Sequence, residues 1–139
     1  MPTNTELVQA ALDAFGRGDI AALLELCSDG VNVTFFGDSS VIPYAGRWEG
    51  KNRVAEYFRI IGETIDVLGW NRQYTVGDAN HVAAFYTGSL RVKASGKMIN
   101  DTHLALDFTA ENGKVTGWQV YSDTAALEKA LALSSRAYA

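Results

Sequence analysis

Hydrophobic side chains recur at helical spacing in three stretches of the first half of the chain. The three stripes consist of Val8, Leu12 and Phe15; of Ile20, Leu23, Leu24 and Cys27; and of Val54, Phe58, Ile61, Ile65 and Leu68. Such stripes are typical of amphipathic helices, which need another layer to lie on. Thr3 and Glu6 fit a capping box at the start of the first helix, and Asp19 fits the N-cap of the second.

Over most of the remaining chain the spacing of apolar residues is instead typical of β-strands. Residues 31–36 are rich in β-branched and aromatic side chains and predict a strand, which an irregular segment separates from the third helix. Further strands are expected over residues 70–76, 81–93, 97–109 and 114–122. The turn signals between them lie at 77–80, 94–96 and 112–113, and connections this short make antiparallel neighbours. Asp123 then begins a terminal helix.

This order of elements predicts an α+β fold in a single domain over residues 1–139. We expect a cone-shaped, curved antiparallel sheet wrapped around a long helix, with two N-terminal helices and a short C-terminal helix. Long strands curl when helices cover one face. A sheet of this curvature is expected to leave a ligand pocket at its wide end.

Composition excludes several classes of protein. The net charge is −4, and no basic face with interleaved aromatics appears, so nucleic acid is not expected as a partner. The chain has no basic-then-apolar leader and no apolar run of about 20 residues, so we expect a cytoplasmic protein without a membrane partner. Cys27 is the single cysteine, which precludes an intrachain disulfide and suggests a small buried hydrophobe.

Metal and cofactor signals are weak. His81 and His103 lie far apart without a matching cluster of ligands, so no metal site is expected. No glycine-rich phosphate loop follows a strand and opens a helix, and the expectation is a protein without a cofactor.

Three segments of the chain carry a family resemblance. Residues 14–33, 43–58 and 112–127 resemble the nuclear transport factor 2-like superfamily, and within it the SnoaL-like and ketosteroid-isomerase-like proteins. The likeness covers nearly the whole chain. It implies the cone-shaped fold, a small-molecule ligand, and a homodimer formed through the outer sheet face. The same fold hosts isomerases, cyclases, hydrolases, dehydratases and non-catalytic binders, so it does not by itself imply a reaction.

The catalytic positions that the resemblance implies are apolar in this chain. The tyrosine and base positions of the steroid isomerases fall on Ala11 and Phe35, and their meander acid falls on Leu104 or Ala105. Epoxide hydrolases of this fold have an aspartate two residues after the tryptophan that aligns with Trp118, where this chain has Val120. Cyclase relatives need only one proton-transfer group near the strand ends, which leaves enzyme activity open.

Three residues are candidates for such a group. Asp101 and His103 share one face of the 97–109 strand, where a carboxylate would orient an imidazole for proton transfer. The opposite face, which includes Asn100 and Thr102, is more apolar and is predicted to be interior, unless a bulge reverses the assignment. Asp123 fits either an acid at the pocket rim or the N-cap of the terminal helix.

The pocket itself is expected to be lined by aromatic side chains and a few hydrogen-bonding groups. The predicted ligand-binding residues are Phe35, Tyr44, Trp48, Phe58, Tyr86, Asn100, Thr102 and Trp118. The sequence therefore favours a protein that binds a small, largely apolar molecule. The alternative is an isomerase, cyclase or hydratase/hydrolase that uses Asp101, His103 or Asp123 as general acid/base.

Overall fold

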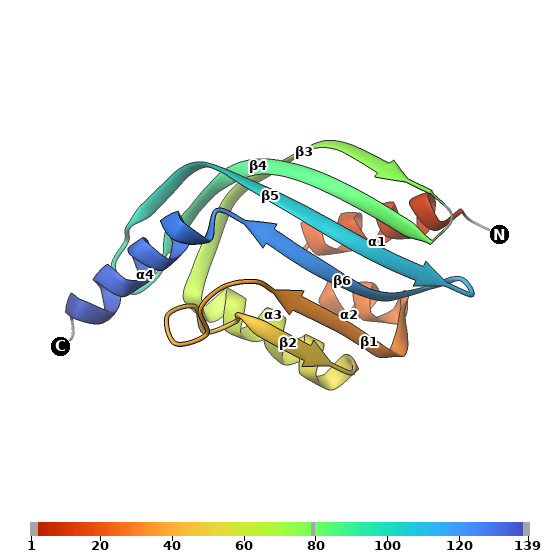
Figure 1. Ribbon diagram of the computed structural model, residues 1–139, viewed down its shortest axis with the longest axis horizontal. Coiled ribbons are helices and arrows are strands. Elements are labelled where there is room, and N and C mark those ends of the chain that lie inside the picture. Colours follow the sequence, from red (N-terminus) through yellow and green to blue (C-terminus); the bar gives the residue numbers. More distant parts are fainter. Residues whose placement is uncertain (1–2, 79, 138–139) are drawn as a thin grey trace.

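The computed structural model describes residues 3–78 and 80–137 and shows an α+β fold. The helices are α1 (Asn4–Gly16), α2 (Ile20–Glu25), α3 (Lys51–Thr64) and α4 (Thr124–Ala137). The strands are β1 (Cys27–Phe35), β2 (Gly46–Glu49), β3 (Ile65–Gly77), β4 (His81–Val92), β5 (Met98–Glu111) and β6 (Lys114–Ser122). Figure 1 shows one curved sheet arching over α1, α2 and α3, with α4 at the end of the arch. The predicted fold class is confirmed.

All six described strands form one open sheet in the order β2-β1-β6-β5-β4-β3. Strands β3 to β6 make the predicted antiparallel meander, whereas β1 runs parallel to β6 and joins the N-terminal half to it. Between β5 and β6, Asn112 and Gly113 have φ of 53° and 76°. Positive φ at both central residues is what a tight type I′ hairpin requires. Ala79, in the turn predicted at 77–80, lies outside the described residues.

The N-terminal helices begin where the sequence predicts, but the second ends earlier. The hydroxyl of Thr3 accepts a hydrogen bond from the Glu6 amide at 3.1 Å, and Asp19 Oδ1 accepts one from the Ala22 amide at 3.0 Å. The placement of Cys27 on the α2 stripe is wrong, because Cys27 opens β1 opposite Val115. The pairing of β1 with β6 thus begins at Cys27, a residue that the local helical spacing assigns to the preceding helix.

The third helix is also shorter than predicted. It ends at Thr64, and Ile65 starts β3 in register with Val92. Ile65 and Leu68 fit the helical spacing, but Ile65 and Val67 also alternate correctly for a strand with one face on the cavity. The segment expected to be irregular before this helix contains the short strand β2, which pairs with β1.

A bulge interrupts β5 near its start. Gly88 pairs with Thr102 and Leu90 pairs with Ile99, so Ser89 faces both Asn100 and Asp101. Asp101 has φ of 54°, the left-handed conformation that a bulge residue can adopt. As a result Ile99 and Thr102 are both buried, whereas Asn100 and Asp101 are exposed. The expectation that Asn100 continues the inner face is wrong, for the reason that the alternation shifts by one residue at the bulge.

Candidate functional site

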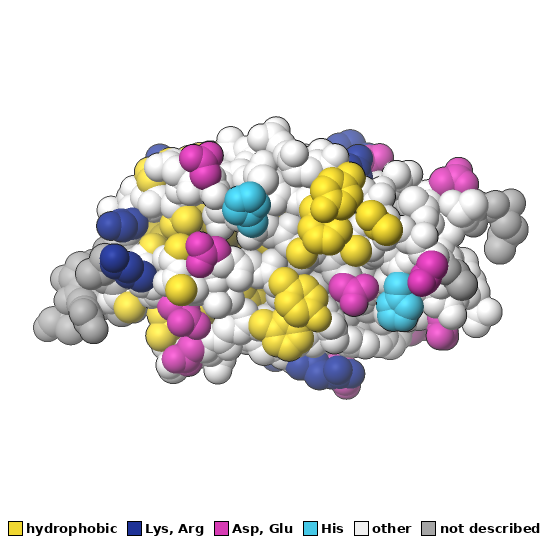
Figure 2. Space-filling model, turned by 45° about the horizontal axis from the view of Figure 1, so that its top comes forward, with side chains coloured by type: hydrophobic (Ala, Val, Ile, Leu, Met, Phe, Trp, Pro, Cys, Tyr) yellow, Lys and Arg dark blue, Asp and Glu magenta, His cyan; other side chains and the backbone are white. Residues whose placement is uncertain are grey.

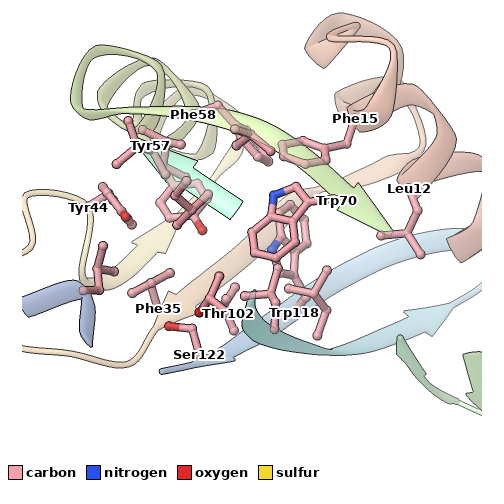
Figure 3. Close-up of a pocket in the computed structure, with 18 of the residues that line it drawn as sticks. Leu12, Phe15, Phe35, Tyr44, Tyr57, Phe58, Trp70, Thr102, Trp118 and Ser122 are labelled. Carbon is pink, nitrogen blue, oxygen red and sulfur yellow. The ribbon is translucent and has the colours of Figure 1, made fainter. Parts of the chain in front are cut away.

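A cavity of about 100 Å³ lies between the inner face of the sheet and the helices beneath it. It has walls from α1, α3 and every strand from β3 to β6, with a further contribution from β1. The aromatic members of the lining are Phe15, Phe35, Tyr44, Tyr57, Phe58, Trp70, Phe108 and Trp118. Figure 3 shows side chains such as Phe15, Tyr57 and Trp118 converging from elements that are far apart in the sequence.

The aromatic rings pack against one another around Phe58 and Trp118. The two ring centroids are 6.0 Å apart, and Trp118 also stacks on Phe108 at 5.3 Å. Phe15 approaches Phe58 from α1 at 5.7 Å. Rings held at such distances by several neighbours form a rigid wall with a defined shape.

Trp70 is placed in this wall by the glycine opposite it. Gly88 pairs with Trp70 across β3 and β4. A Cβ at position 88 would lie 2.0 Å from the Gly69 carbonyl oxygen and 2.6 Å from the Trp70 ring. Only glycine permits this close approach of the two strands.

Four hydroxyl groups line one end of the cavity, which we call the hydroxyl end: those of Tyr44, Tyr57, Thr102 and Ser122. Figure 3 shows them on the opposite side from Leu12 and Phe15. Tyr44 and Tyr57 have ring centroids 6.3 Å apart. Burial raises the pKa of both tyrosines above the usual value, so both stay neutral at physiological pH.

The sheet register brings Thr102 and Ser122 together. Ser122 pairs directly with Leu104, and Thr102 lies two residues before Leu104 on the same face of β5. Thr102 and Ser122 are therefore diagonal neighbours across the strands. The Ser122 hydroxyl oxygen is buried and has no hydrogen-bond partner among the described residues. Unpartnered buried hydroxyls are rare in folded proteins, so this one needs an explanation.

Asp123 stands at the rim of the cavity. Its side chain is exposed, and its Oδ1 accepts a hydrogen bond from the Ala126 amide at 3.2 Å. This confirms the N-cap role that the sequence allows. Asp123 also lines the cavity, at the point where β6 passes into α4. Of the three acid/base candidates, it is the residue on the cavity.

Asp101 and His103 lie on the other side of the sheet. Both are exposed, and His103 borders a shallow hollow of the outer face together with Gln73, Thr87 and Tyr121. A side chain on this face cannot reach a molecule in the cavity through the sheet. The hypothesis that the Asp101–His103 pair acts on a ligand inside the cone therefore has no geometric support.

The predicted ligand-binding residues divide into two groups. Phe35, Tyr44, Phe58, Thr102 and Trp118 line the cavity. Trp48 is buried elsewhere: its indole N–H donates to the Tyr44 carbonyl at 3.1 Å, and the Arg53 guanidinium lies 4.5 Å from its ring centroid.

Tyr86 lies behind the wall, against Trp70 at 6.2 Å between ring centroids, and is not part of the lining. Asn100 is on the outer side of the bulge.

Several lining residues were not predicted. Tyr57 precedes Phe58 on α3, Trp70 opens what the sequence indicates as a strand, and Ser122 ends β6. Ser122 is recoverable from the pattern, since residues 118, 120 and 122 alternate onto one face of the last predicted strand.

No three His, Cys, Asp or Glu side chains within 3–78 and 80–137 gather closely enough to hold a metal ion. Nor does any helix in those ranges have the length and apolar character needed to cross a bilayer.

Solved structures with the same architecture come from several proteins. A nuclear transport factor 2-like protein from Burkholderia xenovorans LB400 is 26% identical, with a TM-score of 0.80, over 94% of this chain and 98% of that one. A candidate polyketide cyclase from Pseudomonas putida KT2440 is 22% identical, with a TM-score of 0.74, over 94% and 99%. TerC, co-crystallised with polyporic acid, is 17% identical, with a TM-score of 0.78, over 91% and 96%.

Sequence comparison with families gives the assignment. No curated protein matches the chain. The family model of the SnoaL-like domain matches residues 8–118, from the first helix to the tryptophan that stacks on Phe108. This range contains most of the cavity lining. The chain therefore belongs to the SnoaL-like domain family.

Proposed function

We propose that this protein binds a small, largely apolar molecule in the cavity beneath its sheet. The observation that carries the proposal is the cavity wall, in which aromatic and aliphatic side chains surround a space with hydroxyl groups at one end. Ligand sites typically combine such an apolar wall with a few placed polar groups. TerC, which shares the fold, was co-crystallised with polyporic acid, an observation about that protein that agrees with ligand binding in this architecture.

The cavity volume limits the ligand. An engineered apolar protein cavity of about 150 Å³ holds benzene. At about 100 Å³ this cavity is smaller, so a single ring enters only if the wall moves slightly or part of the molecule extends past Asp123 at the rim.

Titration with toluene, indole and naphthalene tests the proposal. Amide NMR shifts should move at β5 and β6 for toluene and indole. Phe58→Ala removes one wall and should shift the preference toward naphthalene. Tyr74→Ala, on the exposed outer face, is the matched control and should leave the order of affinities for the three compounds unchanged. No shift with any of the three compounds, in either the parent protein or Phe58→Ala, would refute the proposal.

A reaction on the bound molecule is the second candidate function, and the position of Asp123 favours it. Asp123 lies at the cavity with one carboxylate oxygen in the helix cap, which leaves the other as an acid/base group. Asp123→Asn keeps a good capping residue and removes that chemistry. Deuterium exchange at the α-carbon of 1-indanone in D₂O should exceed the buffer rate in the parent protein and return to it in Asp123→Asn. Equal exchange rates in protein and buffer would refute the reaction, and ligand binding would be the one function still proposed for the cavity.

We also propose a homodimer through the outer sheet face. Tyr74 and Tyr121 are 57% and 46% exposed on this face, stacked on Phe85 and Phe36 respectively. Figure 2 shows hydrophobic side chains gathered here among acidic and histidine side chains. Exposed aromatic groups of this kind are typical of interaction surfaces.

Sedimentation velocity at micromolar concentration should give a dimer for the parent chain. Ala105→Glu places a charge between these aromatics and should give a monomer. A monomeric parent chain would refute the dimer and would leave the ligand proposal untouched.

A further inference from the structure

Five residues form one row across the outer face of the sheet, which we call the outer row. Tyr74 on β3 pairs with Phe85 on β4, and Phe85 pairs with Ala105 on β5. Ala105 in turn pairs with Tyr121 on β6. Phe36, the residue after β1, stacks on Tyr121 at the end of the row. Four of the five side chains are therefore aromatic, and the middle position, Ala105, is the one without a ring.

The rings of the outer row stack from strand to strand. Tyr74 and Phe85 have ring centroids 4.8 Å apart and an interplanar angle of 28°. Phe36 and Tyr121 have centroids 5.0 Å apart and an angle of 29°. These separations match the spacing of about 4.8 Å between neighbouring strands. Phe85 and Tyr121 lie two spacings apart, about 9.5 Å by the same rule, so one flat ring over Ala105 would stack on both.

The structure leaves the space over Ala105 open. A hollow of about 620 Å³ lies over this part of the sheet, and Phe85, Ala105 and Tyr121 are among its lining residues. Figure 2 shows the hydrophobic side chains of this face in separate groups, with acidic and histidine side chains near them. A ring placed between Phe85 and Tyr121 would remove apolar surface from water on both of its faces.

The charged groups around this space are acidic. The described lining of the hollow contains Asp123 and has no Lys or Arg side chain. Asp107 lies two residues beyond Ala105 on the same face of β5, and its Oδ1 is 3.6 Å from Nδ1 of His81. The faces of aromatic rings also attract cations, because the ring quadrupole is negative there. Both features favour a positively charged ring over a neutral or negative one.

We propose that the space over Ala105 is a second binding site, which takes a planar aromatic cation such as an N-alkylated nitrogen heterocycle. The ring of this ligand stacks between Phe85 and Tyr121, with its charge near the carboxylates of Asp107 and Asp123. The site lies on the opposite side of the sheet from the cavity and does not depend on what the cavity binds. The homodimer proposed above would cover the outer row, so a bound ring competes with it.

A matched set of probes tests the site. 1-Methylquinolinium and 1-methylnaphthalene have the same shape, but only the first carries a charge. At pH 8 we expect 1-methylquinolinium to bind about tenfold more tightly by NMR titration, because the ring faces and the carboxylates attract the cation. Nuclear Overhauser effects should connect its protons with the rings of Phe85 and Tyr121. 1-Naphthoate, an anion of similar size, should bind at least about tenfold more weakly than 1-methylquinolinium.

Filling the space with a side chain should remove the binding. Ala105→Phe places a ring between Phe85 and Tyr121 and should weaken 1-methylquinolinium at least about tenfold. Ala94→Phe, in the exposed turn between β4 and β5, adds the same side chain elsewhere and should leave the affinity within about twofold. Circular dichroism of both variants checks that they are folded.

A second variant tests the charge without changing the shape of the site. Asp107→Asn should weaken 1-methylquinolinium about threefold, the effect of one exposed carboxylate, and should leave 1-methylnaphthalene within about twofold. Glu111→Gln removes a carboxylate further along β5 and is the control, with both affinities unchanged.

Each contrary result overturns a stated part of the proposal. Equal affinities for the two probes, or the same preference in Asp107→Asn, would refute the selection of a cation. Nuclear Overhauser effects to Phe58 or Trp118 would place the probe in the cavity and refute the second site. Absence of binding would refute it as well, and a dimer that is lost in Ala105→Phe would then identify a second copy of the chain on the outer row. The proposal for the cavity is untouched by any of these results.

Discussion

The two faces of β5 carry different kinds of side chain although they share one strand. The inner face presents Thr102, Leu104 and Leu106 to the cavity, without a charged group. The outer face presents His103 and Asp107, and Asp107 Oδ1 lies 3.6 Å from Nδ1 of His81 on β4. The residue types with the clearest chemistry are thus on the side that holds no enclosed space. Position relative to the sheet, rather than residue type, decides which groups reach the cavity.

This difference also explains where acid/base chemistry can enter. A charged residue in the middle of the inner face would be buried without a partner, at a large energetic cost. At the end of β6, Asp123 avoids this cost because it is exposed and holds a helix cap. The strand end is therefore the place where a titratable group and the cavity meet.

The largest expected contrast between the two faces is in stability. Phe108→Ala removes a ring that is 3% exposed and stacked on Trp118, and should lower the free energy of unfolding by about 3–5 kcal/mol. Tyr74→Ala removes an exposed outer ring and should cost about 1 kcal/mol or less in the monomer. Urea unfolding measures both values. Similar losses would contradict the assignment of inner and outer faces.

Alkaline pH should act on the inner face through Tyr44 and Tyr57. Burial raises their folded-state pKa values, so the unfolded chain loses these protons first. The contribution of these tyrosines to the free energy of unfolding is fully present below about pH 10. Above that pH it falls by about 1.4 kcal/mol per pH unit for each tyrosine. Urea unfolding between pH 9 and 11 should show this loss. A Tyr44→Phe, Tyr57→Phe double variant with the same pH dependence would contradict it.

A smaller effect is expected at the strand end. Asp123→Ala removes the acceptor for the Ala126 amide and should lower the free energy of unfolding by about 1 kcal/mol. Asp123→Asn keeps a capping side chain and should lower the free energy of unfolding by only about 0.3 kcal/mol. Thermal unfolding followed by circular dichroism would compare them, and equal losses would mean that the cap contributes nothing.

The smallest effect should come from the outer face. His103→Ala should leave the affinities for toluene and indole within about twofold of the parent values, because His103 lies on the outer side of the sheet. A larger change in NMR titration would show that the two faces are coupled.

Much of this fold follows from the sequence pattern. The meander and the tight turn at Asn112 are predicted because alternating apolar positions and turn residues are local signals. The end of α3 is not, since Ile65 satisfies both a helical and a strand period. The position of Cys27 was missed because pairing with β6, a contact over long sequence distance, extends β1 past the local helical pattern.

The candidate site is less predictable than the fold. Phe35, Phe58 and Trp118 are found because apolar faces of regular elements point toward the core. Trp48 and Tyr86 are equally aromatic, but a backbone hydrogen bond turns the first away and Trp70 covers the second. Asn100 was misplaced by one bulge, whose left-handed residue, Asp101, has no distinctive neighbours in the sequence.

That bulge has a consequence for comparing relatives of this chain. Ser89 faces two residues, Asn100 and Asp101, so β5 carries one residue more than its partner needs. Removing Asp101 would restore plain alternation and still leave Ile99 and Thr102 on the same side. A relative one residue shorter here therefore keeps the same lining, provided that its alignment gap is placed at Asp101. A gap placed further along would pair each lining residue with a neighbour from the opposite face.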